Sequence, residues 1–568
     1  MRSLVVRRIG SVPVIFGLAL AVVAAACSPS GRSSTGDDDA VDGSLPPPGP
    51  DAAPGTPDAD VPPSGPPYLD FPASPIVVGT PTLDPATVFA AANQAGAIGP
   101  CLAEPQIGTL FPNGFLRPRF TLASVAAMNL FEIRIHAAYE TNDLVVYSTS
   151  PQWTMDADLW AKISLHLPGQ PITVTIRGAT VSGTTVTNGP ALGTTGDIQV
   201  APVGATGAIV YWTTSGGTAL KGFKMGEESV DVVLRPKNAG IAAPGCIGCH
   251  SLTPDGKYLS FSWVVGTDGF AGEIDLREPL SGDSPALAAQ PPFLTPTALA
   301  LLSRPAQHAP VYSGSHWQDG DHVAITMLQA TTPSGAPTDI IWTDLEATSM
   351  TEGMGWGRIT RVGDSGSAAA ANFSHDGKTI VYVSGTGIDS GVRDRVGDIW
   401  TVPYNNRLGG QATPVAGASD GSVNESYPSF SADDQLIAFN RTSVTCSTCQ
   451  PSSYDNPTAE VFVVDVGGGT AVRLAANDPN QCGSTRTSPG VTNSWPKWSP
   501  GPVDTVDGKS YYWLTFSSRR GSTGLPQIYV APVVRTETGL VTYPAIYLWN
   551  QPANEANHTP AWDQLQID

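Results

Sequence analysis

The sequence predicts an all-β protein, and three observations lead to this fold class. The chain contains 60 Gly and 52 Pro in 568 residues, which is typical of many short strands joined by turns. Val, Thr, Tyr and Trp dominate its apolar runs, and these residue types favour strands. One unit with a period of about 60 residues recurs along the C-terminal part. Helical periodicity is nearly absent, and the best short candidates are residues 84–95 and 155–163.

The first 26 residues predict an export signal. Three arginines within the first eight residues precede an apolar run at 12–26 that is too short and wrongly flanked for a membrane-spanning helix. The small residues before Cys27 resemble a bacterial lipobox, which implies cleavage before Cys27 and diacylation of its thiol. Through the same resemblance, Ser28 implies the outer membrane. The alternative is an ordinary signal peptide cut after Ala26.

Residues 27–67 predict a disordered tether. They consist mainly of Ser, Gly, Asp and Pro with few apolar side chains. Such a segment buries too little apolar surface to offset the entropy lost on ordering. We therefore expect it to hold the folded part away from the membrane.

Residues 68–200 predict a small β-sandwich of the immunoglobulin or fibronectin type. Strand-like runs at 130–136, 144–148 and 172–177 alternate apolar and polar residues between Pro and Gly turns. We find no catalytic constellation in this region. A spacer or adhesion module is the expectation.

Internal repetition predicts the fold of residues 201–568. Each copy has the shape Pro-Xaa-aromatic-Ser, then a turn like Asp-Gly-Lys, then an apolar strand. The complete copies begin at Ala371, Pro428 and Pro496, a degenerate copy begins at Pro310, and a truncated copy ends the chain at 559–563. These residues resemble the TolB-like β-propeller repeat, and the resemblance covers roughly residues 205–568.

A unit of four short strands cannot bury its own faces, so copies of it must stack around a channel. Equivalent positions fall at 250, 310, 371, 428, 496 and 560, which predicts six blades. The last copy stops after one strand. We expect the runs at 208–213 and 230–234 to complete that blade and close the ring.

Cys246, Ile247, Gly248, Cys249 and His250 form the attachment motif of a c-type haem. Two thiols three positions apart can reach both vinyl groups of one porphyrin, and the adjacent imidazole then lies under the iron. The motif predicts one covalent haem c, held by Cys246 and Cys249, with His250 as the proximal iron ligand. The alternative is a disulfide or half of a zinc site. Zinc is disfavoured because the second Cys-Xaa-Xaa-Cys, at 446–449, has no nearby His.

The repeat places this motif at the rim of the ring, where the chain enters the innermost strand of a blade. His308 and His558 each lie two residues before the repeat proline in the two neighbouring blades. Either is a candidate distal iron ligand, which would give bis-His ligation. The alternative is that both bond to the backbone. Met225 and Met354 are further candidates.

Four further cysteines remain: Cys101, Cys446, Cys449 and Cys482. An even number in an exported protein predicts disulfides. We expect Cys482 to pair with Cys446 or Cys449, because these three lie in neighbouring loops of one region. A redox-active pair at 446–449 is disfavoured, since no thioredoxin-like context surrounds it.

Net charge restricts the partners, and the motifs restrict the activity. A charge of −20 argues against nucleic acid and anionic lipid surfaces. The leading hypothesis is an exported mono-haem cytochrome, membrane-bound through its lipid anchor, that transfers electrons to or docks with a protein partner. The alternatives are a non-redox propeller that binds a peptide or protein at its channel, and a haem-dependent oxidoreductase such as a peroxidase. Hydrolysis is disfavoured, because no Ser-His-Asp order or phosphate loop is evident.

Overall fold

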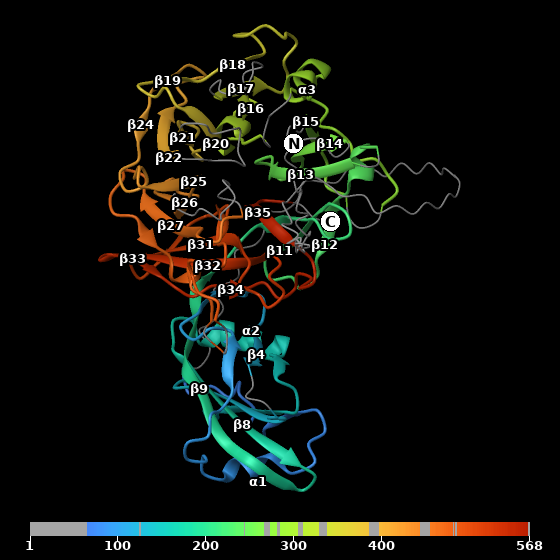
Figure 1. Ribbon diagram of the computed structural model, residues 1–568, viewed down its shortest axis with the longest axis vertical. Helices are drawn as coiled ribbons and strands as arrows, with labels where there is room; N and C mark the ends of the chain where they lie inside the picture. Colours follow the sequence, from blue (N-terminus) through green and yellow to red (C-terminus); the bar gives the residue numbers. More distant parts are fainter. Residues whose placement is uncertain are drawn as a thin grey trace, which may run out of the picture.

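The computed structural model describes residues 65–123, 127–242, 245–265, 273–280, 284–304, 310–328, 338–385, 397–443, 455–480, 482 and 485–565. Most elements are β-strands, which confirms the all-β expectation. Figure 1 shows a small N-terminal body below a larger body whose sheets succeed one another around a centre. Within these ranges no helix has the length and apolar character needed to cross a membrane. The signal segment, Cys27 and most of the tether lie outside the described residues.

The N-terminal unit contains two sheets and two helices. The larger sheet runs in the order β1 (Ile76–Val78), β6 (Leu144–Ser148), β5 (Leu130–Ala137), β8 (Ile172–Ser182), β9 (Thr185–Gly204) and β3 (Leu110–Asn113). The smaller sheet contains β2 (Cys101–Glu104), β4 (Arg119–Ala123) and β7 (Gln152–Thr154). The pairings of β1 with β6 and of β3 with β9 are parallel. The three strands expected from alternation are present as β5, β6 and β8.

Local sequence explains these elements. Along β8, Val174 and Ile176 are fully buried, whereas the intervening threonines are half-buried, as period-two alternation requires. The two expected helices form as α1 (Pro85–Ala90) and α2 (Ala157–His166). Asp84 and Asp156 cap them by accepting hydrogen bonds from backbone N–H groups of the first turn.

Six further sheets follow along the chain. The first contains β12 (Asp231–Leu234), β11 (Ala219–Lys224), β10 (Ala208–Thr213) and β35 (Asn557–Asp563). The second contains β13 (Gly245–Leu252), β14 (Leu259–Val265) and β15 (Glu273–Arg277). The third contains β16 (Val323–Leu328), β17 (Asp339–Asp344) and β18 (Trp356–Arg358). An isolated bridge from Val311 to Ile325 adds an inner edge to the third sheet.

The remaining three sheets have the same antiparallel plan. The fourth contains β20 (Ser367–Phe373), β21 (Thr379–Gly385), β22 (Gly397–Pro403) and β24 (Thr413–Pro414). The fifth contains β25 (Val423–Phe430), β26 (Leu436–Ser443), β27 (Glu460–Asp465) and β28 (Val472–Arg473). The sixth contains β29 (Ser494–Trp498), β31 (Lys509–Ser518), β32 (Gln527–Thr536) and β33 (Gly539–Thr542), with β30 (Asp504–Val506) and β34 (Ile546–Tyr547) beside it.

A few short elements connect these sheets. The strands β19 (Thr360–Val362) and β23 (Gly409–Gln411) pair in parallel between the third and fourth sheets. The short helices are α3 (Pro296–Leu302), α4 (Gly314–Gln318) and the 3-10 turns η1 (Pro236–Ala239) and η2 (Ala475–Asn477).

The repeated turn has a common hydrogen-bond pattern. In three copies, the hydroxyl before the turn donates to the aspartate two residues later, and that carboxylate accepts a second bond from the N–H two residues further on. The hydroxyl bond joins Thr253 to Asp255 at 2.6 Å, Ser374 to Asp376 at 2.7 Å and Ser431 to Asp433 at 2.6 Å. The residue after the aspartate is left-handed, with φ of 69° at Gly256 and 57° at Asp434. These hydrogen bonds explain why Ser, Asp and Gly recur at the same spacing in several copies of the repeat.

The C-terminal strand pairs with the first strand of the ring region. In β35, Ala561 lies opposite Val210 and His558 lies opposite Trp212 of β10. Figure 1 shows the red strand β35 beside the green strands of the first two sheets. The runs at 208–213 and 230–234 therefore complete the last repeat, as its truncation predicts. The indole N–H of Trp562 also donates to the Thr206 carbonyl at 2.8 Å, which fixes β35 to the residues that enter β10.

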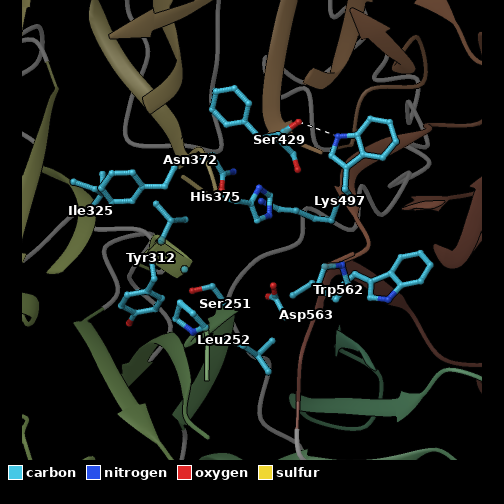
Figure 2. Close-up of a pocket in the computed structure, with 18 of the residues that line it drawn as sticks. Ser251, Leu252, Tyr312, Ile325, Asn372, His375, Ser429, Lys497, Trp562 and Asp563 are labelled. Carbon is cyan, nitrogen blue, oxygen red and sulfur yellow. Dashed lines mark hydrogen bonds between the residues drawn. The ribbon is translucent and has the colours of Figure 1, made fainter. Parts of the chain in front are cut away.

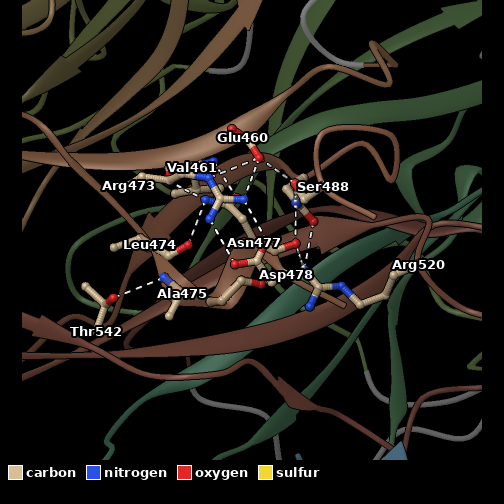
Figure 3. A network of polar contacts seen from close by, with 12 residues as sticks. Glu460, Val461, Arg473, Leu474, Ala475, Asn477, Asp478, Ser488, Arg520 and Thr542 are labelled. Carbon is tan, nitrogen blue, oxygen red and sulfur yellow. Dashed lines mark hydrogen bonds and ion pairs between the residues drawn. The ribbon is translucent and has the colours of Figure 1, made fainter. Parts of the chain in front are cut away.

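A polar network fixes residues 475–478, which connect the fifth and sixth sheets and precede the chain that contacts the N-terminal unit. Arg473 bridges Glu460 at 2.6 Å and Asp478 at 2.8 Å, and the Asn477 amide bonds to both backbone groups of Val461 (Figure 3). Arg520 donates to the Ala476 carbonyl at 2.6 Å. These contacts fix residues 475–478, so the chain that follows them is presented to the N-terminal unit.

Asn480 and Cys482, which follow this network, link the two bodies. The Asn480 amide donates to the carbonyls of Leu102 at 2.8 Å and Ala103 at 2.9 Å. Cys482 forms a disulfide with Cys101, with their Cα atoms 5.3 Å apart. The expected pairing of Cys482 with Cys446 or Cys449 is therefore wrong. The physical reason is that β2 packs against the 480–482 segment, a contact between regions that are far apart in sequence. Cys446 and Cys449 lie outside the described residues.

We predict that the Cys101–Cys482 bond stabilises the junction between the two bodies. Cys482→Ser should lower the free energy of unfolding by about 2–4 kcal/mol, because it frees a long loop in the unfolded chain. Urea unfolding under non-reducing conditions measures this change. Cys101→Ser and the double variant should match it, since all three remove the same bond. Additive losses in the double variant would contradict the pairing.

Candidate functional site

Five of the inner strands contain a β-bulge at the same repeat position or one residue from it. The register shifts between Ala369 and Asn372 in β20, between Ser426 and Ser429 in β25, and between Ser494 and Lys497 in β29. A corresponding shift occurs in β13 and in the pairing of β35 with β10. Bulges redirect side chains and are common beside functional sites. Here they turn the inner strands around a common space.

Backbone strain accompanies the bulges. The residue before the repeat proline position has a left-handed φ in four inner strands: 48° at Ala370, 52° at Tyr427, 61° at Trp495 and 46° at Thr559. Aromatic and β-branched residues rarely adopt this conformation. It persists only where the surrounding structure imposes it, and such positions cluster at ligand sites.

The inner strands enclose a cavity of about 510 Å³. Its size lies within the range of small-molecule and cofactor sites. Figure 2 shows polar side chains from several sheets directed into this space. The polar residues that line it include Ser251, Asn372, Ser429, Lys497 and Asp563.

Residues that follow the repeat proline position connect neighbouring sheets. The Ser251 hydroxyl donates to the carbonyl of Pro310, and the Asn372 amide donates to the carbonyl of Pro428 at 3.0 Å. Lys497 occupies the equivalent position in β29. Among the described residues no hydrogen bond or ion pair involves its ammonium group, which therefore faces the cavity.

The haem motif lies in β13, and its bulge falls at Gly248–Cys249. Ile247 pairs with Trp263 and His250 with Phe261, so the two residues between them have no partner in the ladder. Cys249 and His250 line the cavity. The sequence predicts the motif at the rim of the ring. In the structure, two of its residues form part of the cavity wall.

His250 is buried and neutral. Only 7% of it is exposed, and burial lowers its pKa to about 4. Its Nε2 lies 3.1 Å from the Val210 carbonyl oxygen, which can only accept, so Nε2 carries the proton. Its Nδ1 then has a bare lone pair, and that buried atom has no hydrogen-bond partner. A neutral imidazole with an unpartnered nitrogen has the chemistry of a metal ligand.

The two cysteines of the motif differ. Cys249 is a free thiol, and burial raises its pKa although Ser262 bonds to it. Cys246 is 4% exposed, its sulfur takes part in a disulfide, and it does not line the cavity. The donor set at the cavity therefore fits attachment through Cys249 and His250. In this state Cys246 has no thiol for a second thioether bond.

His558, the predicted distal ligand that lies among the described residues, does not line the cavity. His558 is 2% exposed and stacks edge-on against Trp212, with ring centroids 4.6 Å apart. Burial, together with the nearby charges of Arg519 and His250, lowers its pKa to about 3. It is absent from the cavity wall, so its role as distal ligand stays a prediction that this placement speaks against. His308 lies outside the described residues.

The methionine candidates lie elsewhere. Met225 packs against the core of the N-terminal unit, and Met354 is 69% exposed on an outer loop. In the described residues, no cluster of three or more His, Cys, Asp and Glu side chains is placed to hold a metal ion. Of the predicted site residues, Cys249 and His250 line the cavity, and the iron-ligand roles stay predictions.

Sequence reasoning missed the pair Lys497 and Asp563. Burial lowers the pKa of Lys497 to about 8 and raises that of Asp563 to about 6, and each charge partly opposes the shift of the other. The repeat alignment carried a signal for Lys497: it follows the repeat proline, as Ser251 and Asn372 follow theirs. Asp563 had no such signal, because the last copy is truncated.

The comparisons with known proteins add little. No family model matches the chain, and no curated protein matches it. Among solved structures it is similar to an ancestral GH74 enzyme, with a TM-score of 0.34 and 10% identity over 62% of this chain and 40% of that one. It is also similar to the hydrazine synthase of Kuenenia stuttgartiensis, with a TM-score of 0.26 and 13% identity over 53% and 73%. A third similar structure is a thermostable family-43 glycoside hydrolase, with a TM-score of 0.31 and 11% identity over 54% of this chain and 96% of that one. Similarity at this level carries no argument about activity.

We predict that Cys249 reacts slowly with thiol reagents in folded, haem-free protein. Its raised pKa lowers the thiolate fraction at pH 8, and its half-buried position restricts access, so alkylation by iodoacetamide should be at least tenfold slower than in unfolded protein. Mass spectrometry of the peptide containing Cys249 measures the rate. The same protein in guanidinium chloride is the control. Equal rates in the two states would show that the thiol is neither buried nor shifted.

Proposed function

We propose that this protein is an exported, lipid-anchored c-type cytochrome whose haem is held at the central cavity of a six-bladed β-propeller. The observation that carries the proposal is the placement of a free thiol, Cys249, beside a neutral imidazole with an unpartnered buried nitrogen, His250, on one cavity wall. In the proposed ring, each of the six sheets is one blade. Its support is the pairing of β35 with β10 and the succession of inner strands around one cavity.

Residues of this chain have distinct parts in that function. Cys249 supplies a sulfur to a haem vinyl group, and His250 supplies a nitrogen to the iron. Cys246 supplies the second sulfur only as a thiol, so two-electron reduction of its disulfide by a dithiol must come first, with the dithiol oxidised in turn. The buried inner strands exclude water from the cofactor. A haem bound there supplies one-electron transfer to a protein partner.

The proposed location follows from the N-terminal residues. We infer cleavage before Cys27, diacylation of Cys27 and attachment to the outer membrane, with residues up to about 67 as a tether. What supports this inference is the export-signal pattern alone. Labelling of the exported protein with radioactive palmitate, lost in Cys27→Ser, is the direct measurement.

A second candidate function has an observation in its favour. The cavity has a polar wall and an unpaired cation, and the Cys246 sulfur is already bonded. These features suit a propeller that binds a ligand or partner without haem. The two functions predict different cofactor content, and one experiment separates them.

We predict covalent haem in protein exported from a host with cytochrome c maturation. Pyridine haemochrome spectra and intact mass should show one macrocycle that survives denaturation and acid extraction. Cys249→Ala and His250→Ala should lose most of it, whereas Cys246→Ala should keep one bond and give a shifted haemochrome band. Cys482→Ser, which lies outside the motif, is the matched control and should stay loaded. Colourless protein of unmodified mass would leave only the binding function.

A further inference from the structure

Lys497 is the one Lys or Arg on the described wall of the central cavity. Figure 2 shows its side chain extending from β29 into the cavity. At the equivalent position, Ser251 and Asn372 donate to the carbonyl of the next inner strand. Lys497 makes no such bond in the described residues, so this site departs from the repeat in both charge and contact.

The nearest opposite charge does not neutralise Lys497. Asp563 lies on the neighbouring strand β35, and the two influence each other electrostatically, yet no ion pair within 4.0 Å joins them in the described structure. A partly buried ammonium without a partner is unfavourable, and an anion in the cavity removes that cost. The geometry therefore leaves a place for a negative group beside Lys497.

The cavity wall next to Lys497 is aromatic. Tyr427 and Trp495 both line the cavity, and their ring centroids are 4.4 Å apart. Both are bulge residues held at a left-handed φ, so the backbone fixes where these rings lie. Aromatic side chains favour contact with flat apolar rings. The wall thus offers a surface for a planar group and, two residues after Trp495, a cation.

We propose that the cavity is a binding site for a planar apolar ring system that carries a carboxylate, with Lys497 as the carboxylate-binding residue. Two sources can supply this chemistry. One is a propionate of a haem attached at Cys249, and the other is a free aromatic carboxylate. The site itself does not depend on haem, so it goes beyond the cytochrome function and can be tested without it.

The charges around Lys497 fix the pH dependence of binding. The titratable groups that line the same cavity are Asp563, His375, His250, Tyr312, Tyr427 and Cys249. Carboxylate binding requires a protonated Lys497, whose pKa is about 8, so affinity should fall as the pH rises through 8. Protonation of Asp563, whose pKa is about 6, removes a negative charge from the cavity. Affinity should therefore rise further as the pH falls through 6.

The test uses haem-free full-length protein from a host without cytochrome c maturation. The probe is 1-naphthoate, followed by quenching of tryptophan fluorescence, and 1-naphthamide is its neutral counterpart. We expect Lys497→Met to weaken naphthoate binding at least tenfold at pH 7 and to leave naphthamide binding unchanged. Lys497→Arg should restore naphthoate binding. Lys509→Met, at an exposed lysine of the same sheet, is the matched control.

Haem-loaded protein distinguishes the two sources. If the carboxylate is a haem propionate, loaded protein excludes naphthoate, and Lys497→Met lowers the haem reduction potential because a nearby positive charge is lost. If the source is a free carboxylate, loaded protein still binds naphthoate through Lys497. Equal affinity for naphthoate and naphthamide, or no effect of Lys497→Met, would overturn the proposal. Absence of haem would end the cytochrome function and leave this site standing.

Discussion

The pairing of β35 with β10 is the constraint on which the rest of the structure depends. It joins the last strand of the chain to β10, so a strand from the C-terminal end completes the first sheet beside the central cavity. The inner strands can then contain residues with unfavourable backbone angles, because contacts with neighbouring strands restrain them. The left-handed φ of Tyr427 and Trp495 persists under that restraint.

The haem motif uses this restraint. In β13 the bulge falls on Gly248 and Cys249, one residue earlier than the corresponding unpaired residues of β20 and β25. The shift leaves His250 paired with Phe261 and its ring bonded to Val210 of the closing sheet. The imidazole is thus positioned by its hydrogen bond to the first sheet, and Nδ1 has the lone pair because Nε2 carries the proton.

Much of the fold could be predicted from local patterns, because strands, turns and repeats are properties of short segments. The Asp255 and Asp376 turns, strands β5, β6 and β8, and the completion of the last repeat by residues 208–213 follow from alternation and spacing. The Cys101–Cys482 bond could not be predicted, since it depends on how two bodies pack across 381 residues of sequence. The side-chain direction of His558 could not be predicted for a related reason. The repeat predicts the position of His558 along its strand, but the direction of its side chain depends on packing against Trp212.

The same crosslink has a mechanical consequence. Residues 102–481 form a covalent loop that is closed at its base by the Cys101–Cys482 disulfide and that contains four of the six inner strands or edges. Tension applied between the N-terminal side of Cys101 and the C-terminal side of Cys482 passes through this bond and bypasses the loop. The wall that carries Cys249 and His250 is therefore shielded from force that is applied along the backbone on the N-terminal side of Cys101.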